Sequence, residues 1–294
     1  MRAAHIASND LPPVVRHGSE ECRLHDAIDT HCHVSPIWYE PVETLLFQMQ
    51  RHGVSHAVLT QMLGQTDNAY LLECAARFPG RFSCVGGIDE SSDAAAQELR
   101  ALARAGIRGV RLQAAPAPAG LSFERLWRAA ADENLVVSCA GPVSAFMSRA
   151  FERRLLEFPS LIVLGEHLGG LARADTPADP DTLEGIRALA RYANFHLKVP
   201  SLGQFCPRPR TFSGRQRPLD PGAGRLIHEI VEAFGSERLC WGSDFPLVSG
   251  REGYGNALEW SRELLQSLGT QAARNVLSNT ARRIFRIVAE SASA

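Results

Sequence analysis

The sequence predicts a single (β/α)8 barrel, and two observations lead to this fold class. Short apolar segments alternate with amphipathic segments along most of the 294 residues. The first residues of eight successive apolar segments lie 28, 27, 26, 28, 26, 33 and 44 positions apart, which suits one strand, one helix and two short loops. Because each helix returns the chain to the same edge, the strands are expected to be parallel and to close into an α/β TIM barrel.

Eight segments have the short, apolar composition of strands and are bounded by turn residues. We predict strands at residues 26–30, 54–61, 81–88, 107–113, 135–139, 161–167, 194–199 and 238–244. Between them, apolar side chains recur at three- and four-residue spacing, which is the period of a helix with one buried face. We predict helices near residues 42–49, 68–78, 94–105, 123–133, 146–158, 182–192, 225–234, 257–268 and 272–287.

An open, doubly wound parallel sheet is the alternative fold. We disfavour it because no Gly-x-Gly-x-x-Gly turn follows the first predicted strand. The expected organisation is an N-terminal arm, residues 1–23, followed by one barrel, residues 24–294.

The composition excludes several classes of protein. Lysine and arginine together number 31 and aspartate and glutamate 32, so the net charge of −1 favours neither nucleic acid nor an anionic membrane as a partner. No apolar run approaches the roughly 20 residues of a membrane-spanning helix, and residues 1–23 lack the apolar core of a signal peptide. Seven cysteines without framework spacing are typical of a reducing compartment. We therefore expect a soluble, cytoplasmic protein, and whether it forms a homo-oligomer stays open.

Polar residues end three of the predicted strands, at the face where such barrels place their active sites. The first strand ends in Asp29-Thr30-His31-Cys32-His33, and two-residue alternation is expected to turn Asp29, His31 and His33 to one side. His167 ends the sixth strand and Asp244 the eighth. Imidazole nitrogens and a carboxylate oxygen are ligands suited to Zn²⁺. A lone histidine at a strand end is usually structural, but this combination within one barrel predicts a functional site.

These motifs also resemble a known family. Asp29-Thr30-His31-Cys32-His33, Gly109-Val110-Arg111-Leu112, Glu166-His167-Leu168-Gly169-Gly170 and Gly242-Ser243-Asp244-Phe245-Pro246 resemble the amidohydrolase superfamily, in the branch of the 2-pyrone-4,6-dicarboxylate hydrolases and sugar lactonases. The resemblance runs from about residue 26 to residue 285. It implies a (β/α)8 barrel that hydrolyses an ester, lactone or amide, in most members with one or two divalent metals.

The leading hypothesis is a hydrolase that opens a lactone or ester C–O bond of a small carboxylated metabolite. Asp244 is expected to act as general base, activating water and then protonating the leaving oxygen. One divalent metal, for which zinc is the favoured identity, would be held by His31, His33 and Asp244. His167 would orient the water or the carbonyl. Without a metal, His31, His33 and His167 would polarise the carbonyl directly.

The sequence departs from the metal-bearing members at the fifth strand, where they usually carry a histidine. Here that strand ends in Ser138-Cys139-Ala140-Gly141, and the fourth ends in Arg111-Leu112-Gln113, without a bridging lysine or carboxylate. We therefore expect at most one metal ion, with metal-independent catalysis as the alternative. Cys139 is either a thiolate ligand or a small, buried apolar residue.

Four further residues are candidates for substrate binding. Arg111 has a guanidinium fork that can bind a substrate carboxylate, and a salt bridge at the barrel rim is the alternative. Gln61 ends the second strand and is expected to reach the same pocket. Trp38 and Tyr39 would form an apolar pocket wall or pack in the core.

Two other functions stay open. Related barrels cleave C–C and C–N bonds with the same strand positions, so the first is a decarboxylase or an amidase. The second is a catalytically inactive barrel that binds a metabolite, and the presence of His31, His33, His167 and Asp244 speaks against it.

Overall fold

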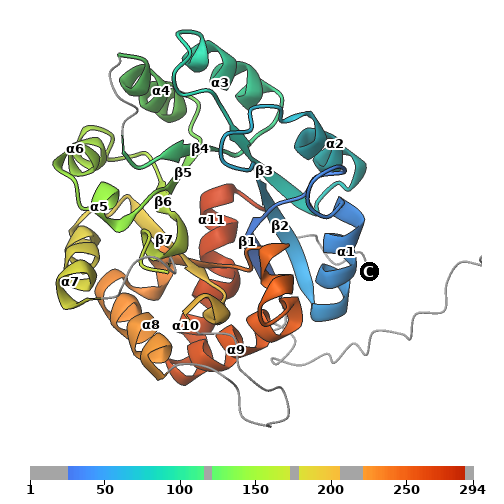
Figure 1. The fold of residues 1–294 in the computed structure, drawn as a ribbon, viewed down its shortest axis with the longest axis vertical. Coiled ribbons are helices and arrows are strands. Elements are labelled where there is room, and N and C mark those ends of the chain that lie inside the picture. The colour runs from blue at the N-terminus through green and yellow to red at the C-terminus, as the bar shows by residue number, and fades with distance from the viewer. Residues whose placement is uncertain (1–25, 116–120, 173–178, 206–220, 289–294) are drawn as a thin grey trace, which may run out of the picture.

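The computed structural model describes residues 26–115, 121–172, 179–205 and 221–288. Within these residues, eight strands pair in chain order, and every pair is parallel (Figure 1). The strands are β1 (Ala27–Cys32), β2 (Val54–Thr60), β3 (Phe82–Gly87), β4 (Gly109–Gln113), β5 (Val136–Ala140), β6 (Val163–Gly165), β7 (Phe195–Pro200) and β8 (Leu239–Gly242). Each overlaps a segment that the sequence predicts as a strand. The expected N-terminal arm, residues 1–23, lies outside the described residues.

The segment after β8 closes on the segment after β1. The N–H of His33 donates to the carbonyl oxygen of Phe245 over 2.7 Å. The N–H of Asp244 donates to the carbonyl oxygen of His31 over 2.8 Å. Cys32 and Phe245 form a parallel bridge between the same two segments. The predicted (β/α)8 barrel is therefore confirmed, and the open sheet is wrong.

Helices connect the strands and surround the barrel (Figure 1). They are α1 (Val42–His52), α2 (Ala69–Arg77), α3 (Ala95–Arg104), α4 (Leu121–Asp132), α5 (Val143–Phe146), α6 (Arg149–Glu157), α7 (Pro180–Ala188), α8 (Pro221–Phe234), α9 (Tyr254–Ser267), α10 (Thr270–Arg274) and α11 (Thr280–Phe285). None of those in the described part of the chain is long and apolar enough to cross a membrane.

Two predicted helices are divided in the structure. The segment 146–158 forms the end of α5 and then α6, because Ser148 is extended (φ −75°, ψ 146°) and its Oγ accepts a hydrogen bond from the N–H of Phe151. Ser148 is thereby the N-cap of a new helix. The segment 272–287 is divided by a π-helical turn, Asn275–Asn279, between α10 and α11.

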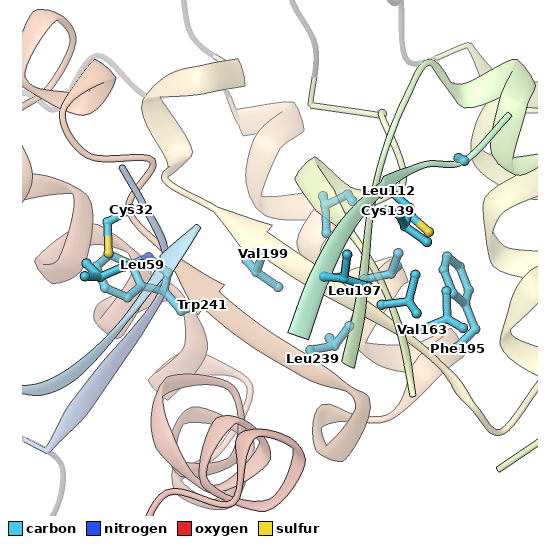
Figure 2. Close-up of a cluster of buried hydrophobic side chains, with 14 of the residues drawn as sticks. Cys32, Leu59, Leu112, Cys139, Val163, Phe195, Leu197, Val199, Leu239 and Trp241 are labelled. Carbon is cyan, nitrogen blue, oxygen red and sulfur yellow. The ribbon is translucent and has the colours of Figure 1, made fainter. Parts of the chain in front are cut away.

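Apolar side chains form two layers of core. The larger layer lies between the strands and the surrounding helices and includes Leu112 and Phe195 (Figure 2). The smaller layer joins residues of six strands, among them Val58 and Val136, to Phe285 and its neighbours on α11. Side chains from six strands can meet only inside the ring, so α11 closes one end of the barrel, and Figure 1 shows it in the middle of the strands. The opposite end, where the strands finish, is left for the site.

One extra residue in β1 changes which side chains point into the barrel. Between the pairs Asp29–Ala57 and Cys32–Leu59, β1 advances three residues while β2 advances two. This bulge interrupts the two-residue alternation. Asp29 consequently accepts hydrogen bonds from Ser243 and from the hydroxyl of Tyr254, the first residue of α9, over 2.6 and 3.0 Å. The expectation that Asp29 joins His31 and His33 on one side is therefore wrong.

Candidate active site

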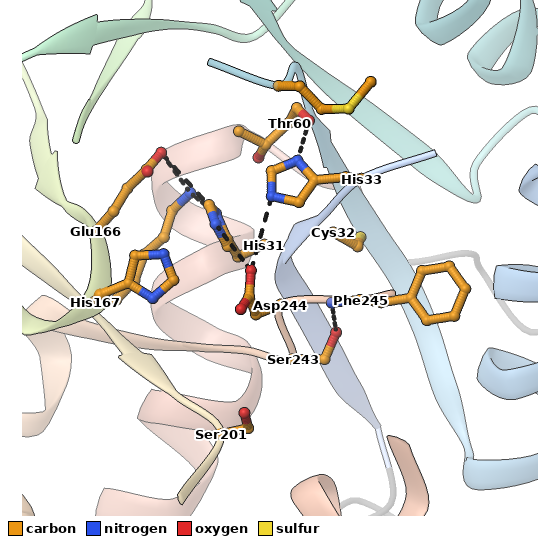
Figure 3. Close-up of polar contacts among 12 residues, drawn as sticks. His31, Cys32, His33, Thr60, Glu166, His167, Ser201, Ser243, Asp244 and Phe245 are labelled. Atoms are coloured by element: carbon orange, nitrogen blue, oxygen red, sulfur yellow. Dashed lines mark hydrogen bonds and ion pairs between the residues drawn. The ribbon is translucent and has the colours of Figure 1, made fainter. Parts of the chain in front are cut away.

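The four expected catalytic residues meet at the C-terminal end of the barrel. Figure 3 shows His31, His33, His167 and Asp244 turned toward one another. The ring centroid of His31 lies 4.8 Å from that of His33 and 5.0 Å from that of His167. Oδ1 of Asp244 lies 3.7 Å from Nε2 of His31 and 3.8 Å from Nε2 of His33. The structure therefore brings together residues from three strand ends, the first and last of which lie 213 positions apart in the sequence, from His31 to Asp244.

The backbone is in an unusual conformation at two of these residues. His167 has φ of 50° and Asp244 has φ of 62°, and Leu168 beside His167 has φ of 56°. Residues with a Cβ rarely adopt this left-handed region, and holding one there costs on the order of 1–3 kcal/mol. Strain of this kind collects at functional sites because the surrounding structure maintains it.

His33 is neutral, and its Nε2 has a free lone pair. Its Nδ1 lies 2.7 Å from the carbonyl oxygen of Thr60, and because a carbonyl only accepts, Nδ1 carries the proton. Burial lowers the pKa of His33 to about 3, although the bond to Thr60 opposes the shift. At neutral pH, Nε2 of His33 therefore presents an acceptor toward Asp244.

Lys198 lies below His31, inside the barrel. Its Nζ is 2.9 Å from Nδ1 of His31 and 3.7 Å from Oε1 of Glu166, and the side chain is fully buried. Burial lowers the pKa of Lys198, and Glu166 opposes the shift. Burial, followed by the charge of Lys198, holds the pKa of His31 well below its ordinary value. His31 is thus a neutral ring with a cationic group on one side.

Glu166 is bound by two strands. Arg111 of β4 donates from Nη2 to Oε2 over 2.7 Å and from Nε to Oε1 over 3.1 Å, and Ser138 of β5 donates to Oε1 over 2.8 Å. Burial would raise the pKa of Glu166, but Arg111 and Lys198 outweigh it and hold this pKa well below its ordinary value. Arg111 therefore forms an ion pair, as in the alternative weighed for it, although the pair is inside the barrel. Its binding of a substrate carboxylate stays a prediction.

The two oxygens of Asp244 have different surroundings. Oδ2 accepts hydrogen bonds from Nε2 of Gln204 over 2.8 Å and from Nη1 of Arg251 over 3.3 Å. Oδ1 faces the rings of His31 and His33. Burial raises the pKa of Asp244, while His167 and Arg251 oppose the shift. Asp244 therefore has one oxygen held in place and one directed at the histidines.

A pocket of about 1050 Å³ leads to this group from outside. Its polar lining consists mainly of His33, Arg111, His167, Gln204, Asp244 and Arg251. Large apolar side chains line the rest, namely Ile37, Trp38, Tyr39, Met62, Leu63 and Leu247. Trp38 is 77% exposed, so it belongs to the pocket wall and not to the core.

The sequence predicts that Gln61 reaches this pocket, but its side chain is bound to the backbone of the loop after β2. Its side-chain amide donates to the carbonyl oxygen of Asp67 over 2.5 Å and accepts from the N–H of Met62 over 2.8 Å. Its own carbonyl oxygen accepts a hydrogen bond from Nη1 of Arg111 over 2.8 Å. Gln61 thus connects the loop after β2 to Arg111.

One divalent metal fits a group that differs from the expected ligand set. In the described residues, His31, His167 and Asp244 each offer a ligand atom, and these atoms lie within 4.8 Å of one another. His167 therefore takes the place expected for His33 in this group, although Nε2 of His33 also faces Oδ1 of Asp244 at 3.8 Å. Nε2 of His31 is buried without a hydrogen-bond partner in the described structure, as an unfilled ligand would be. Nitrogen and oxygen donors suit zinc.

Two observations limit metal binding. His31 offers a lone pair at Nε2 only when its proton is on Nδ1, toward Lys198. Cys139 is not part of the group: it is fully buried in the apolar layer between strands and helices (Figure 2). Burial raises the pKa of the Cys139 thiol well above its ordinary value, so the thiol form is favoured. This favours the interpretation of Cys139 as a small apolar residue.

Comparison with known proteins identifies the family. The sequence model of a family described as amidohydrolase matches residues 28–287. The chain belongs to the amidohydrolase family. The resemblance seen in the sequence motifs is thereby confirmed, and the match covers almost all of the barrel.

Three proteins show how far the similarity of this amidohydrolase extends. The L-fucono-1,5-lactonase of Burkholderia ambifaria is 28% identical over 255 residues, which cover 81% of this chain and 82% of that protein. A Pseudomonas putida structure described as a 2-pyrone-4,6-dicarboxylic acid hydrolase has a TM-score of 0.72 and 24% identity, covering 90% of this chain and 99% of the other. The 5-carboxyvanillate decarboxylase of Sphingomonas paucimobilis has a TM-score of 0.63 and 15% identity, covering 90% of this chain and 99% of the other. The two structures show a shared fold.

Sequence reasoning missed Lys198, Gln204 and Arg251. Lys198 had a detectable signal: it is the only lysine among 294 residues and lies in a strand that is otherwise almost wholly apolar. Gln204 and Arg251 follow β7 and β8 in connecting segments, where polar residues are common, so the sequence does not distinguish them.

Proposed function

We propose that this amidohydrolase hydrolyses a lactone or ester C–O bond of a small carboxylated metabolite. The observation that carries the proposal is the placement of Asp244, whose Oδ1 faces two ring nitrogens at 3.7 and 3.8 Å where the pocket ends. The similarity to a lactonase supports an ester-type bond. Arg111 and Arg251 in the pocket lining bring N–H donors to the pocket that suit a carboxylate, while each also pairs with a carboxylate of the protein.

Asp244 acts as the general base of the proposed reaction. Oδ1 takes a proton from a water molecule as the water oxygen attacks the carbonyl carbon of the substrate. Collapse of the resulting tetrahedral oxyanion breaks the C–O bond, and Asp244 returns the proton to the leaving oxygen. Because burial raises its pKa, this carboxylate is a better base than an exposed one.

The histidines have unequal roles in this scheme. With the Lys198 ammonium next to its Nδ1, His31 carries a proton on Nε2 and donates it in a hydrogen bond to the carbonyl oxygen. His33 accepts a hydrogen bond from the water through Nε2, because its Nδ1 proton is committed to Thr60. His167 also lines the pocket and orients the same water molecule.

A bound divalent ion would be held by His31, His167 and Asp244. In that case the ion would polarise the carbonyl and lower the pKa of the attacking water. Asp244, Arg111 and the pocket walls would keep their parts in binding and proton transfer.

The apolar wall defines the kind of substrate that fits. Trp38 and Tyr39 offer flat surfaces against which a planar or ring-shaped molecule packs. Ring centroids of Tyr39 and His33 lie 6.1 Å apart, so a ring on Tyr39 is close to the reacting groups. Several N–H groups of Arg111 are already bound to Glu166 and Gln61, so a bidentate contact with a substrate carboxylate would compete with these bonds.

The test is a panel of substrates assayed for two different products. L-fucono-1,5-lactone, 2-pyrone-4,6-dicarboxylate and an uncharged δ-lactone are mixed with the protein, and ring opening is measured as proton release. We expect turnover of a carboxylated lactone and its loss in Asp244→Asn. Release of CO₂ from a carboxylated phenol would indicate a decarboxylase, and ammonia from an amide would indicate an amidase. Ligand binding with no turnover of any compound would support the inactive barrel.

A further inference from the structure

One amide connects two of the active-site residues. Gln204 lies just after β7, in the 3₁₀ turn Leu202–Phe205. Its Nε2 donates to Oδ2 of Asp244 over 2.8 Å, and its Oε1 lies 3.0 Å from Nδ1 of His167. Gln204 also lines the pocket. The side chain therefore contacts both the proposed base and the histidine opposite it.

The polarity of the amide determines that Nδ1 of His167 carries a proton. A carboxylate oxygen accepts hydrogen bonds, so the NH₂ end of Gln204 must face Asp244. The carbonyl end then faces His167, and because a carbonyl also accepts, Nδ1 of His167 must carry the ring proton. The reversed amide would place two acceptors, Oε1 and Oδ2, against each other.

We infer that Gln204 is a positioning residue that fixes the tautomer of His167 and the orientation of Asp244. With its proton on Nδ1, the neutral ring of His167 directs the lone pair of Nε2 into the site. With Oδ2 held, Asp244 directs Oδ1 at the same place. The role in catalysis rests on the proposed function, whereas the tautomer of His167 does not.

The turn that carries Gln204 is itself fixed. The N–H of Gly203 donates to Oε1 of Glu252 over 2.9 Å, and Oγ of Ser201 accepts from Nη2 of Arg251 over 3.1 Å. A Cβ at position 203 would collide with the carboxylate of Glu252, so only glycine lets this carboxylate approach. The Glu252 side chain is 3% exposed. These contacts hold Gln204 at the distance where one amide spans both partners.

The experiment compares two variants by a readout that needs no substrate. Protein labelled with ¹⁵N-histidine gives ring-nitrogen chemical shifts that distinguish the two tautomers, and His167→Asn assigns the signals of His167. We expect the Nδ1–H form in the wild type and in Gln204→Glu, which keeps an acceptor for His167. We expect that form to be lost in Gln204→Met. Gln97→Met, at an exposed position on α3, is the control and leaves the His167 signals in place.

Kinetics on the same variants separate positioning from folding. Loss of a hydrogen bond to a charged group predicts a fall in kcat of roughly ten- to a hundredfold in both Gln204→Met and Gln204→Glu, with KM changed less than about threefold. Unchanged His167 shifts in Gln204→Met would overturn the inference, and if that variant does not fold, wild-type kcat in Gln204→Glu would do so. If the protein turns over no lactone, the proposed function fails, and the nitrogen shifts alone decide whether Gln204 fixes His167.

Discussion

Arg111 and Glu166 form a buried ion pair directly beneath the active site. Nη2 of Arg111 lies 2.7 Å from Oε2 of Glu166, and the two side chains are 7% and 1% exposed. Burial removes both charged groups from water, so each is stabilised mainly by the opposite charge of the other. The pair connects β4 to the end of β6 and sets the charge around His31 and Lys198.

Arg111→Met is expected to damage stability and catalysis together. Removing one partner of a buried pair leaves the other charge uncompensated, which typically costs about 3–5 kcal/mol. Chemical denaturation measures this loss. Arg100→Met is the matched control, because its pairs with Asp132 and Glu133 are at the surface, where such a contact contributes about 0–1 kcal/mol.

The same variant tests the carboxylate clamp predicted for Arg111. If the ion pair is its main role, KM rises alike for a carboxylated and for an uncharged lactone. If the guanidinium binds a substrate carboxylate, KM rises only for the carboxylated lactone, by roughly ten- to a hundredfold. That selective effect with unchanged stability would return Arg111 to the role of clamp.

Asp244→Asn is expected to lower kcat by about 10²–10⁴-fold, the usual contribution of general-base catalysis. The amide keeps the shape of the side chain and one oxygen but lacks the basic carboxylate. Steady-state kinetics on the best lactone of the panel, with thermal unfolding for stability, measure the effect. Asp132→Asn on α4 changes a surface carboxylate and should keep wild-type kcat. Near-native turnover of Asp244→Asn would remove this residue from the mechanism.

Most of the barrel could be predicted because each strand and helix has its own period in the sequence. The active site could also be predicted as one group, because parallel strands end at one face of the barrel. This brings together His31, His33, His167 and Asp244. The exception is Asp29, whose direction depends on the bulge opposite Ala57 and Leu59 of β2. A bulge is a property of pairing between strands, so two-residue alternation in β1 alone does not show it.

The contacts that organise the site were beyond the sequence. Lys198 and His31 are 167 positions apart, and Gln204 and Asp244 are 40 apart. Which of several polar side chains after β7 reaches Asp244 depends on the turn held by Glu252. The place of His167 in the metal group likewise depends on how closely the ends of β1, β6 and β8 approach in three dimensions, which a sequence pattern does not specify.

His33 should make the protein less stable in acid. Its pKa is about 3 in the folded protein against an ordinary 6.5, so between these values the unfolded chain binds a proton that the folded protein does not. The free energy of unfolding therefore falls as the pH falls through this window, by about 1.4 kcal/mol per pH unit for one histidine. Denaturation of His33→Gln across pH 4–7 should give a slope that is shallower by that amount.

A second histidine provides the control for this slope. His228 is an exposed residue of α8, and His228→Gln should retain the wild-type dependence of stability on pH. A His33→Gln slope equal to that of the wild type would mean that His33 is protonated in the folded protein as readily as in the unfolded chain.

Lys198 is expected to weaken metal binding at the site. An ammonium 2.9 Å from Nδ1 of His31 keeps the ring proton on Nε2, which then has no lone pair for an ion, and its charge repels a cation. In Lys198→Met both effects are absent. We expect zinc to bind Lys198→Met at least about tenfold more tightly than the wild type, a difference of about 1.4 kcal/mol. Titration calorimetry on chelator-treated protein measures this, with one ion per chain.

Two companion variants show whether the ion occupies the expected group. Lys198→Arg keeps the positive charge and should not gain affinity, whereas Asp244→Asn combined with Lys198→Met should lose the gain because a ligand is missing. Lys198 is the only lysine, so ¹⁵N-lysine labelling gives a single side-chain Nζ signal in the wild type, which should move when zinc binds beside His31. Equal zinc affinity of Lys198→Met and the wild type would show that Lys198 does not control the lone pair of His31, and the metal would then bind independently of this contact.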